Sequence, residues 1–193
     1  MQNEVLRTIM ARRSIRQYEK RQIDDEQLNA ILEAAIWAPS GNNSQSWLFT
    51  VIRNHGVLAE LNEVVRQASI VWELDESEAQ NLTVREQARQ EGYSFFFNAP
   101  TLIIASNRPN YINAIADCAA ALENIFLAAT SLGLGSCWIN RLRRLTDDES
   151  VRSYLAKLNI PREHVICGSA VIGYTTQSPE AKPRRDGCVQ IIN

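Results

Sequence analysis

Two groups of basic side chains stand out in a chain whose formal net charge is only -2. The first surrounds a serine hydroxyl, and its members are Arg12, Arg13, Ser14 and Arg16. The second consists of Lys182, Arg184 and Arg185. Guanidinium groups present planar pairs of N–H donors that match the oxygens of a phosphate. The two groups therefore predict a site for a phosphate-bearing ligand, and two solvated basic stretches are the alternative.

A loop rich in hydrogen-bonding groups follows Pro39. Its sequence, SGNNSQS from Ser40 to Ser46, consists almost entirely of amides, hydroxyls and glycine. Proline biases the residue before it away from helical geometry, so this segment separates a helix from the next strand. The loop is either part of a ligand site or an ordinary turn.

The segment from Gly133 to Ser136 is not a dinucleotide-binding motif. In the Rossmann fold the glycines follow a strand and begin a helix, whereas here a helix ends at them, and a C-terminal cap explains Gly133. The chain also has no GxxxxGK[ST] phosphate loop, no GxSxG nucleophile elbow and no HExxH zinc motif. We therefore expect a bound cofactor to carry the chemistry, with no catalytic side chain and no metal.

Composition sets limits on the partners and the location of the protein. The net charge of -2 removes the general attraction that a nucleic-acid binder uses, so no nucleic-acid partner is expected. Four cysteines without a CxxC pair and two histidines form no zinc pattern. No signal-peptide stretch and no run of about 18 apolar residues is visible. These features predict a cytoplasmic protein with reduced thiols and no membrane partner.

Apolar periodicity predicts the helices that position the basic loop and the polar loop. A short helix carries Val5, Leu6, Ile9 and Met10 on one side and leads into the basic loop. A second helix is predicted between residues 23 and 37, where Asp24 and Gln27 can form a capping box. Its expected buried residues are Leu28, Ile31, Leu32, Ala35 and Ile36.

Four further segments predict strands. They are Trp47 to Arg53, the continuous apolar run TLIIAS from Thr101, SCWIN from Ser136, and HVICGSAVIGY from His164. A helix from Ile112 to Leu132 is apolar on more than one face, so a second subunit or the rest of a single domain must cover it. A capping box at Thr146 to Glu149 predicts one more helix.

The region from about 56 to 97 is predicted to be a helical surface excursion, because the stretch around Glu73 to Gln90 is polar and acidic. It ends at Phe95, Phe96 and Phe97, which belong either to the core or to a ligand site. With 193 residues, 45% of them hydrophobic and 22% charged, the whole chain 1–193 is expected to form one α+β domain.

Four segments together resemble the nitroreductase family of FMN proteins. They occur in the order ARRSIR, APSGNNSQSW, LGLGSCWI and KPRR, and they span nearly the whole chain. The resemblance implies an α+β sandwich with a mixed, mostly antiparallel sheet flanked by helices. It also implies an intertwined homodimer with two FMN sites at the interface.

The resemblance assigns roles to individual positions. Arg12, Arg13 and Ser14 correspond to phosphate and ribityl contacts, and Arg16 to the basic residue beside the N1 and O2 edge of the flavin. Lys182, Arg184 and Arg185 would complete the phosphate site. The loop that approaches the ring, largely from the other subunit, comprises Pro39, Ser40, Gly41, Asn43 and Gln45. The backbone that passes the reactive edge near N5 comprises Trp138, Ile139 and Asn140.

Two departures from the family pattern concern the substrate side. Ser46 replaces the proline usual before the tryptophan, and Asn140 with Arg141 stand where small residues are common. The second departure narrows the site or adds a positive charge near the substrate.

The activity implied is transfer of a hydride from NADH or NADPH through flavin N5 to a small electron-poor acceptor, such as a nitroaromatic, a quinone or an enone. One flavin face would serve both partners, which predicts ping-pong kinetics. A flavin-binding or redox-sensing protein without turnover is one alternative. A phosphate-ligand binding domain without flavin is another.

Overall fold

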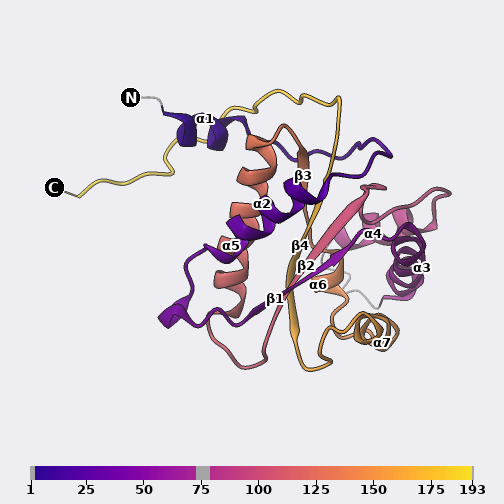
Figure 1. Cartoon of the computed structure of the whole chain (residues 1–193). Coiled ribbons are helices and arrows are strands. Elements are labelled where there is room, and N and C mark those ends of the chain that lie inside the picture. The colour runs from indigo at the N-terminus through magenta and orange to yellow at the C-terminus, as the bar shows by residue number, and fades with distance from the viewer. Residues whose placement is uncertain (1–2, 73–78, 193) are drawn as a thin grey trace.

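The computed structural model describes residues 3–72 and 79–192 and is built on a four-stranded sheet (Figure 1). Its strands are β1 (Trp47–Ile52), β2 (Thr101–Asn107), β3 (Gly135–Ile139) and β4 (Val165–Gly173). They lie in the order β1-β2-β4-β3, and each neighbouring pair is antiparallel. A parallel bridge between Ser14 and Ser136 extends the β3 edge. The sheet is therefore mixed and mostly antiparallel, as predicted.

Helices cover both faces of this sheet (Figure 1). On one side lie α2 (Asp25–Ile36) and α5 (Ala114–Ser131). On the other lie α3 (His55–Val71), α4 (Ala79–Arg89) and α7 (Glu149–Lys157), with the short α6 (Arg141–Arg144) after β3. The first helix, α1 (Glu4–Ala11), contacts α5, and a 3-10 turn, η1 (Gly41–Asn43), precedes β1. This arrangement confirms the α+β sandwich.

Strand β2 is the centre of the core because both of its faces are buried. Leu102 and Ile104 pack with α3 and α7 on one side of the sheet. Ile103 and Ala105 alternate with them and pack with α2 and α5 on the other. Side chains on a strand point to opposite faces in turn, so a continuous apolar run suits a strand that is covered on both sides.

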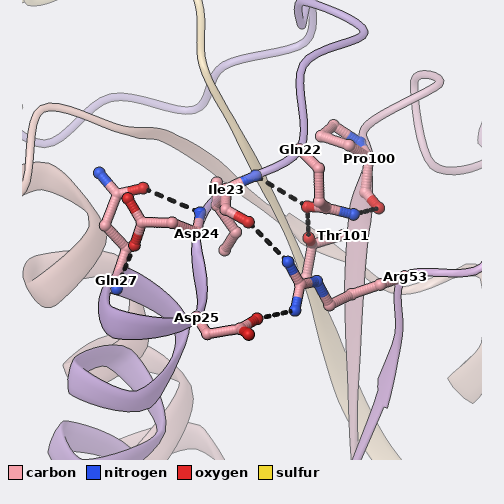
Figure 2. A network of polar contacts seen from close by, with 8 residues as sticks. All are labelled: Gln22, Ile23, Asp24, Asp25, Gln27, Arg53, Pro100 and Thr101. Carbon is pink, nitrogen blue, oxygen red and sulfur yellow. Dashed lines mark hydrogen bonds and ion pairs between the residues drawn. The ribbon is translucent and has the colours of Figure 1, made fainter.

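The start of α2 is fixed by a polar network (Figure 2). The backbone N–H of Gln27 donates to Asp24 Oδ1 at 2.7 Å, and the backbone N–H of Asp24 donates to Gln27 Oε1 at 3.3 Å. These two bonds are the predicted capping box. Arg53, just after β1, donates to the Ile23 carbonyl at 2.7 Å and pairs with Asp25. The network therefore ties the helix N-terminus to the end of the first strand.

Two local predictions are wrong, and one helix was not predicted. The N-cap of α7 is Asp148, whose side chain accepts from the Val151 amide at 3.0 Å, and not Thr146, which lies before the helix begins. Ile36, which was expected to be buried, is the last residue of α2 and is 55% exposed. The helix α6 was not predicted, since four residues with the sequence RLRR show no apolar period.

The helix α5 fills the space between α2 and the sheet. Its buried residues include Cys118, Leu122, Ile125 and Phe126, whereas Ile115 remains 48% exposed. Among the described residues it is also the helix whose length and apolar content would suffice to cross a membrane. Packing in the core on several sides accounts for this composition.

The region expected to be a surface excursion contains α3 and α4. Leu58, Leu61 and Val65 of α3 are fully or almost fully buried against the sheet, so this helix is part of the core. Val84 and Ala88 of α4 are also buried. Residues 73–78, in the acidic part of the region, lie outside the described residues.

Candidate functional site

The basic loop leaves α1 and runs beside the edge strand β3. Arg12 ends the helix, and its Nε lies 3.6 Å from a Glu123 carboxylate oxygen. The Nη1 of Arg13 donates to the carbonyls of Met10 and Arg12 at 2.6 and 2.7 Å, while its Nε is buried without a partner. The N–H of Ile15 donates to the Ser136 carbonyl at 2.9 Å, which places Ser14 beside β3.

One cavity adjoins this loop on the side of Arg13. It has a volume of about 200 Å³ and lies between the basic loop, the end of α5 and the segment after β4. Its lining includes Arg13, Gly135 and Gln177. A Cβ on Gly135 would lie 2.9 Å from Ile15 Cγ2, so glycine permits the loop to approach the strand closely.

A second cavity of about 200 Å³ lies on the side of Arg16. Its lining residues come from the basic loop, the segment before β2, the end of β3 and α6, and they are Arg16, Phe95, Phe97, Trp138, Ile139, Asn140, Arg141 and Arg144. The Arg16 guanidinium lies 5.9 Å from the centre of the Phe97 ring. The structure thus brings together four residues that the sequence predicts for one site, namely Arg16, Trp138, Ile139 and Asn140.

Two details shape the wall of the Arg16 cavity. The Trp138 indole Nε1 donates to Asn140 Oδ1 at 2.6 Å and fixes the end of β3. Phe97 has φ of 55°, in the left-handed region that a bulky side chain rarely adopts. Strained backbone of this kind often marks a functional site, because the surrounding structure must hold it in place.

Cys137 and Tyr18, two ionisable side chains that feel the charge of Arg16, are held in their neutral forms. Burial raises the pKa of the Cys137 thiol, although the charges of Arg16 and Arg12 and a bond from Ser14 oppose this effect. Burial also raises the pKa of Tyr18, whose hydroxyl donates to the Ile15 carbonyl at 2.7 Å. The positive charge of the site is therefore not balanced by an ionised thiol or phenol at neutral pH.

The polar loop after Pro39 is anchored on the first turn of α5. The Gly41 N–H lies 3.2 Å from each carboxylate oxygen of Asp117, and the Tyr111 hydroxyl donates to the Gly41 carbonyl at 3.0 Å. Gln45 donates through Nε2 to Asn43 Oδ1 at 2.9 Å, and its N–H donates to Ser40 Oγ at 3.1 Å. The loop is therefore ordered by hydrogen bonds within itself and with the segment around the start of α5.

Within one chain the polar loop and the basic loop lie near different ends of α5. The polar loop contacts Asp117, whereas Ala11 and Arg13 share a cavity with Thr130 and Gly133. The stretch of helix from Asp117 to Thr130 is about 20 Å long at about 1.5 Å per residue. The two predicted halves of the site therefore do not meet in a single chain.

The second basic group lies in an extended tail after β4. Lys182, Arg184 and Arg185 are all exposed. The beginning of the tail contacts the basic loop, because the Arg16 N–H donates to Gln177 Oε1 at 3.1 Å. Beyond this point the tail extends toward the end of the molecule that carries α1 (Figure 1).

Several functional candidates escape prediction from the sequence. Asp117 and Tyr111 hold the polar loop, and Arg144 supplies a cation to the Arg16 cavity. Arg141 lies in the same cavity, as its predicted positive charge near the substrate requires. The signal for Arg144 was the RLRR segment directly after the SCWIN strand. The sequence contains no such signal for Asp117 and Tyr111, since their role depends on the packing of α5 against the loop.

The arrangement fits a ligand with a phosphate at one end and a flat ring at the other. The basic loop separates two cavities, and the linings of both contain cations but no carboxylate. The orphaned Nε of Arg13 and the buried, unpartnered Ser136 hydroxyl offer polar groups close to the loop. These are the donors that a phosphorylated chain such as that of FMN requires.

Comparisons with known proteins agree with this fold. The model of the nitroreductase family matches residues 9–174. A nitroreductase with bound FMN from Bacteroides fragilis is 43% identical, covers 100% of both chains and superposes with a TM-score of 0.91. Another, from Desulfitobacterium hafniense, is 26% identical with the same coverage and a TM-score of 0.84.

A curated relative from Archaeoglobus fulgidus, described as an NADH dehydrogenase/NAD(P)H nitroreductase, is 33% identical. The match covers 89% of this chain and 85% of the relative. With the family model matching most of the sequence, the chain belongs to the nitroreductase family.

Proposed function

We propose that the protein is an FMN-dependent oxidoreductase that accepts hydride from NADH or NADPH and reduces a small electron-poor acceptor. The observation that carries the proposal is the convergence of Arg16 with Trp138, Ile139 and Asn140 on one cavity beside the basic loop. The Bacteroides fragilis relative, which has the same fold at 43% identity, contains FMN. When bound, the flavin would supply hydride acceptance and donation at N5.

The residues of this chain would bind and orient the cofactor. Arg12, Arg13 and Ser14 provide donors for the phosphate and the ribityl chain, and the exposed tail adds its three basic side chains, Lys182, Arg184 and Arg185. Arg16 places a cation on the wall of the ring cavity and stabilises negative charge that develops there. The segment from Trp138 to Asn140 orients the reacting edge through its backbone.

We further propose that the complete site is formed by two chains in a homodimer. The polar loop from Pro39 to Gln45 lies near the opposite end of α5 from the cavity at Arg13, so its contribution to the site requires a second copy. The surface around α1, α2 and α5 also exposes apolar side chains. Trp37 is 77% exposed and Ile112 is 94% exposed. Large exposed apolar side chains such as these are typical of an interface.

We also propose that the chain acts as a single domain in the cytoplasm. Core clusters on both faces of the same sheet support one folding unit. The thiols of Cys118, Cys137 and Cys167 are free and buried, as expected for a reducing compartment.

The identity of the cofactor is the first test. The purified protein is expected to be yellow and to release FMN on denaturation, which chromatography of the supernatant identifies. Recovery of FAD, or a colourless protein that cannot be reconstituted with FMN, would contradict the proposal and favour a phosphate-ligand binding domain. Anaerobic bleaching of the bound flavin by NADH or NADPH, followed by recovery of colour with a nitroaromatic or a quinone, separates an enzyme from a non-catalytic flavin-binding or redox-sensing protein.

A further inference from the structure

The Arg16 cavity contains two cations besides the one that we assign to the flavin. Three of its lining residues are arginines, and two of them, Arg141 and Arg144, come from α6. Among residues 3–72 and 79–192, no ion pair or hydrogen bond engages either of these two guanidinium groups. The lining contains no carboxylate, and its other members are aromatic, apolar or amide side chains.

Arg141 is the more constrained of the two cations. Its Nη1 is buried and has no hydrogen-bond partner. Burial lowers the pKa of the Arg141 guanidinium; Tyr93 opposes this effect and the charge of Arg144 adds to it. An arginine nevertheless remains protonated at neutral pH. A buried guanidinium nitrogen without a hydrogen-bond partner is costly, and an oxyanion in the cavity would supply the missing acceptor.

The geometry of α6 separates the cavity arginines from their neighbour. Arg141 and Arg144 are three residues apart and lie on the same face of the helix. Arg143, between them, is exposed and does not line the cavity. The sequence RLRR therefore directs two of its three cations to one site, and the third provides a matched control.

We propose that this enzyme selects acceptors that carry a carboxylate on an aromatic ring, with Arg141 and Arg144 binding the carboxylate and Phe95 and Phe97 contacting the ring. The inference rests on the proposed function, in which Arg16 is assigned to the flavin and the α6 arginines are left for the substrate. Bidentate pairing of guanidinium with carboxylate gives both affinity and orientation. Aromatic side chains provide the flat apolar contact that a ring requires.

A phosphate of the nicotinamide donor has the same oxyanion chemistry as a carboxylate. The two sources can be separated because the reaction has two halves. If the α6 arginines bind the acceptor, their loss affects the step that oxidises the flavin. If they bind the donor, their loss affects the step that reduces it.

The test uses the FMN-loaded protein and two acceptors of the same shape, 4-nitrobenzoate and the neutral 4-nitrobenzamide. The wild-type protein is expected to show a kcat/KM at least tenfold higher for the acid. Arg141→Gln and Arg144→Gln are each expected to lower the ratio of acid to amide roughly tenfold to a hundredfold, as for the loss of one charge-assisted bond. Arg143→Gln is expected to keep the wild-type ratio.

A binding measurement provides a readout that does not depend on turnover. Calorimetric titration of the oxidised holoprotein with 4-nitrobenzoate is expected to show a similar loss of affinity in Arg141→Gln and Arg144→Gln but not in Arg143→Gln. Because Arg144 is exposed, its variant keeps the test valid if Arg141→Gln fails to fold.

Equal kcat/KM values for the two acceptors, with a ratio unchanged by the α6 variants, would overturn the inference while leaving the oxidoreductase function intact. Slower flavin reduction by NADPH in these variants, with an unchanged ratio, would also overturn it by assigning the arginines to the donor. A protein that holds no FMN and reduces neither acceptor would instead refute the proposed function, and the inference would fall with it.

Discussion

At the scale of single residues, some side chains of the basic loop stabilise the fold, and others are free to bind a ligand. Arg13 uses its Nη1 to bind the last carbonyls of α1, so its removal would disturb the helix as well as a ligand. Arg12 makes only a long contact with a half-exposed Glu123, and such pairs contribute little to stability. Arg12 and Ser14 are therefore the positions at which ligand binding can be tested with least effect on folding.

Arg12→Ala and Ser14→Ala are each expected to weaken FMN binding by about 1.5 to 3 kcal/mol, or roughly tenfold to a hundredfold, through the loss of one charge-assisted hydrogen bond. Fluorescence titration of the apoprotein with FMN measures the effect. Arg7→Ala is the control, since Arg7 is exposed on α1 and lies 3.9 Å from Glu4 alone. Unchanged dissociation constants in both test variants would show that the loop is a solvated surface.

The buried phenol of Tyr18 is expected to make the free energy of unfolding vary with pH in the alkaline range. Burial raises its pKa above the unfolded value, so the folded protein retains the phenol proton that the unfolded chain releases. The free energy of unfolding is therefore expected to fall as the pH rises above about 10, the ordinary tyrosine pKa. Tyr18→Phe should flatten this slope, although it also loses the bond to Ile15 at every pH. Urea unfolding of both proteins at pH 8 and above measures this slope.

Tyr174→Phe is the control for the lost hydrogen bond, because it removes a tyrosine hydroxyl that donates to Gln27 Oε1 at 2.8 Å and leaves Tyr18 in place. A slope that is equally steep in wild type and Tyr18→Phe would assign the alkaline destabilisation to another group, such as the buried Cys137 thiol.

Residue types alone predict part of the site. A phosphate-binding role for Arg12, Ser14 and Arg16 is a prediction from their chemistry and spacing, and the structure does bring Arg16 to the end of β3. Asp117 and Arg144 could not be assigned in this way, because each depends on contacts between segments far apart in the sequence. A carboxylate on a helix and a cation after a strand have no local pattern that distinguishes them from solvated side chains.

At the scale of elements, local patterns predict the structure best where burial is continuous. The β2 strand follows from its unbroken apolar run, and the start of α2 follows from the Asp24 capping box. The pattern fails at short or terminal segments, such as α6, where the register is set by the end of β3 and by the burial of Leu142. The sequence pattern also assigns the N-cap of α7 to Thr146, although the Asp148 side chain accepts the capping hydrogen bond from the Val151 N–H.

The polar loop is expected to tolerate no side chain at Gly41. A Cβ there would overlap the Asn113 amide and lie 2.8 Å from the Tyr111 hydroxyl. Gly41→Ala is therefore expected to destabilise the protein by about 1 to 3 kcal/mol through overpacking, and to displace a loop that we assign to the flavin site. Urea unfolding and FMN titration measure the two effects.

The double variant Gly41→Ala/Asn113→Ala tests the cause of this destabilisation. Removing the Asn113 amide provides space for the new methyl group, so the double variant should recover part of the lost free energy, as coupled neighbours do. Strictly additive effects of the two substitutions would mean that the crowding at Gly41 is relieved in some other way.

At the scale of the whole molecule, the apolar surface and the divided site lead to the same conclusion. The exposed apolar residues of α1, α2 and the segment before α5 lie on the opposite side of the sheet from α3 (Figure 1). A groove of about 370 Å³ among α1, α2 and α5 includes Val5, Trp37 and Leu127. A second chain that covered this surface could also supply the polar loop that a single chain places far from Arg13.

If the site is shared, then folding, dimerisation and flavin retention are linked, because a ligand that binds only the assembled state stabilises it by mass action. Trp37→Glu, which adds a charge to the groove, is expected to shift the protein toward monomers and to release FMN in parallel. Val71→Glu is the control, since Val71 is 67% exposed but lies on α3, on the other side of the sheet. Sedimentation at low micromolar protein, with absorbance of bound flavin, follows both quantities on dilution. A stable monomer with a full complement of FMN would refute the shared site while leaving flavin binding by one chain intact.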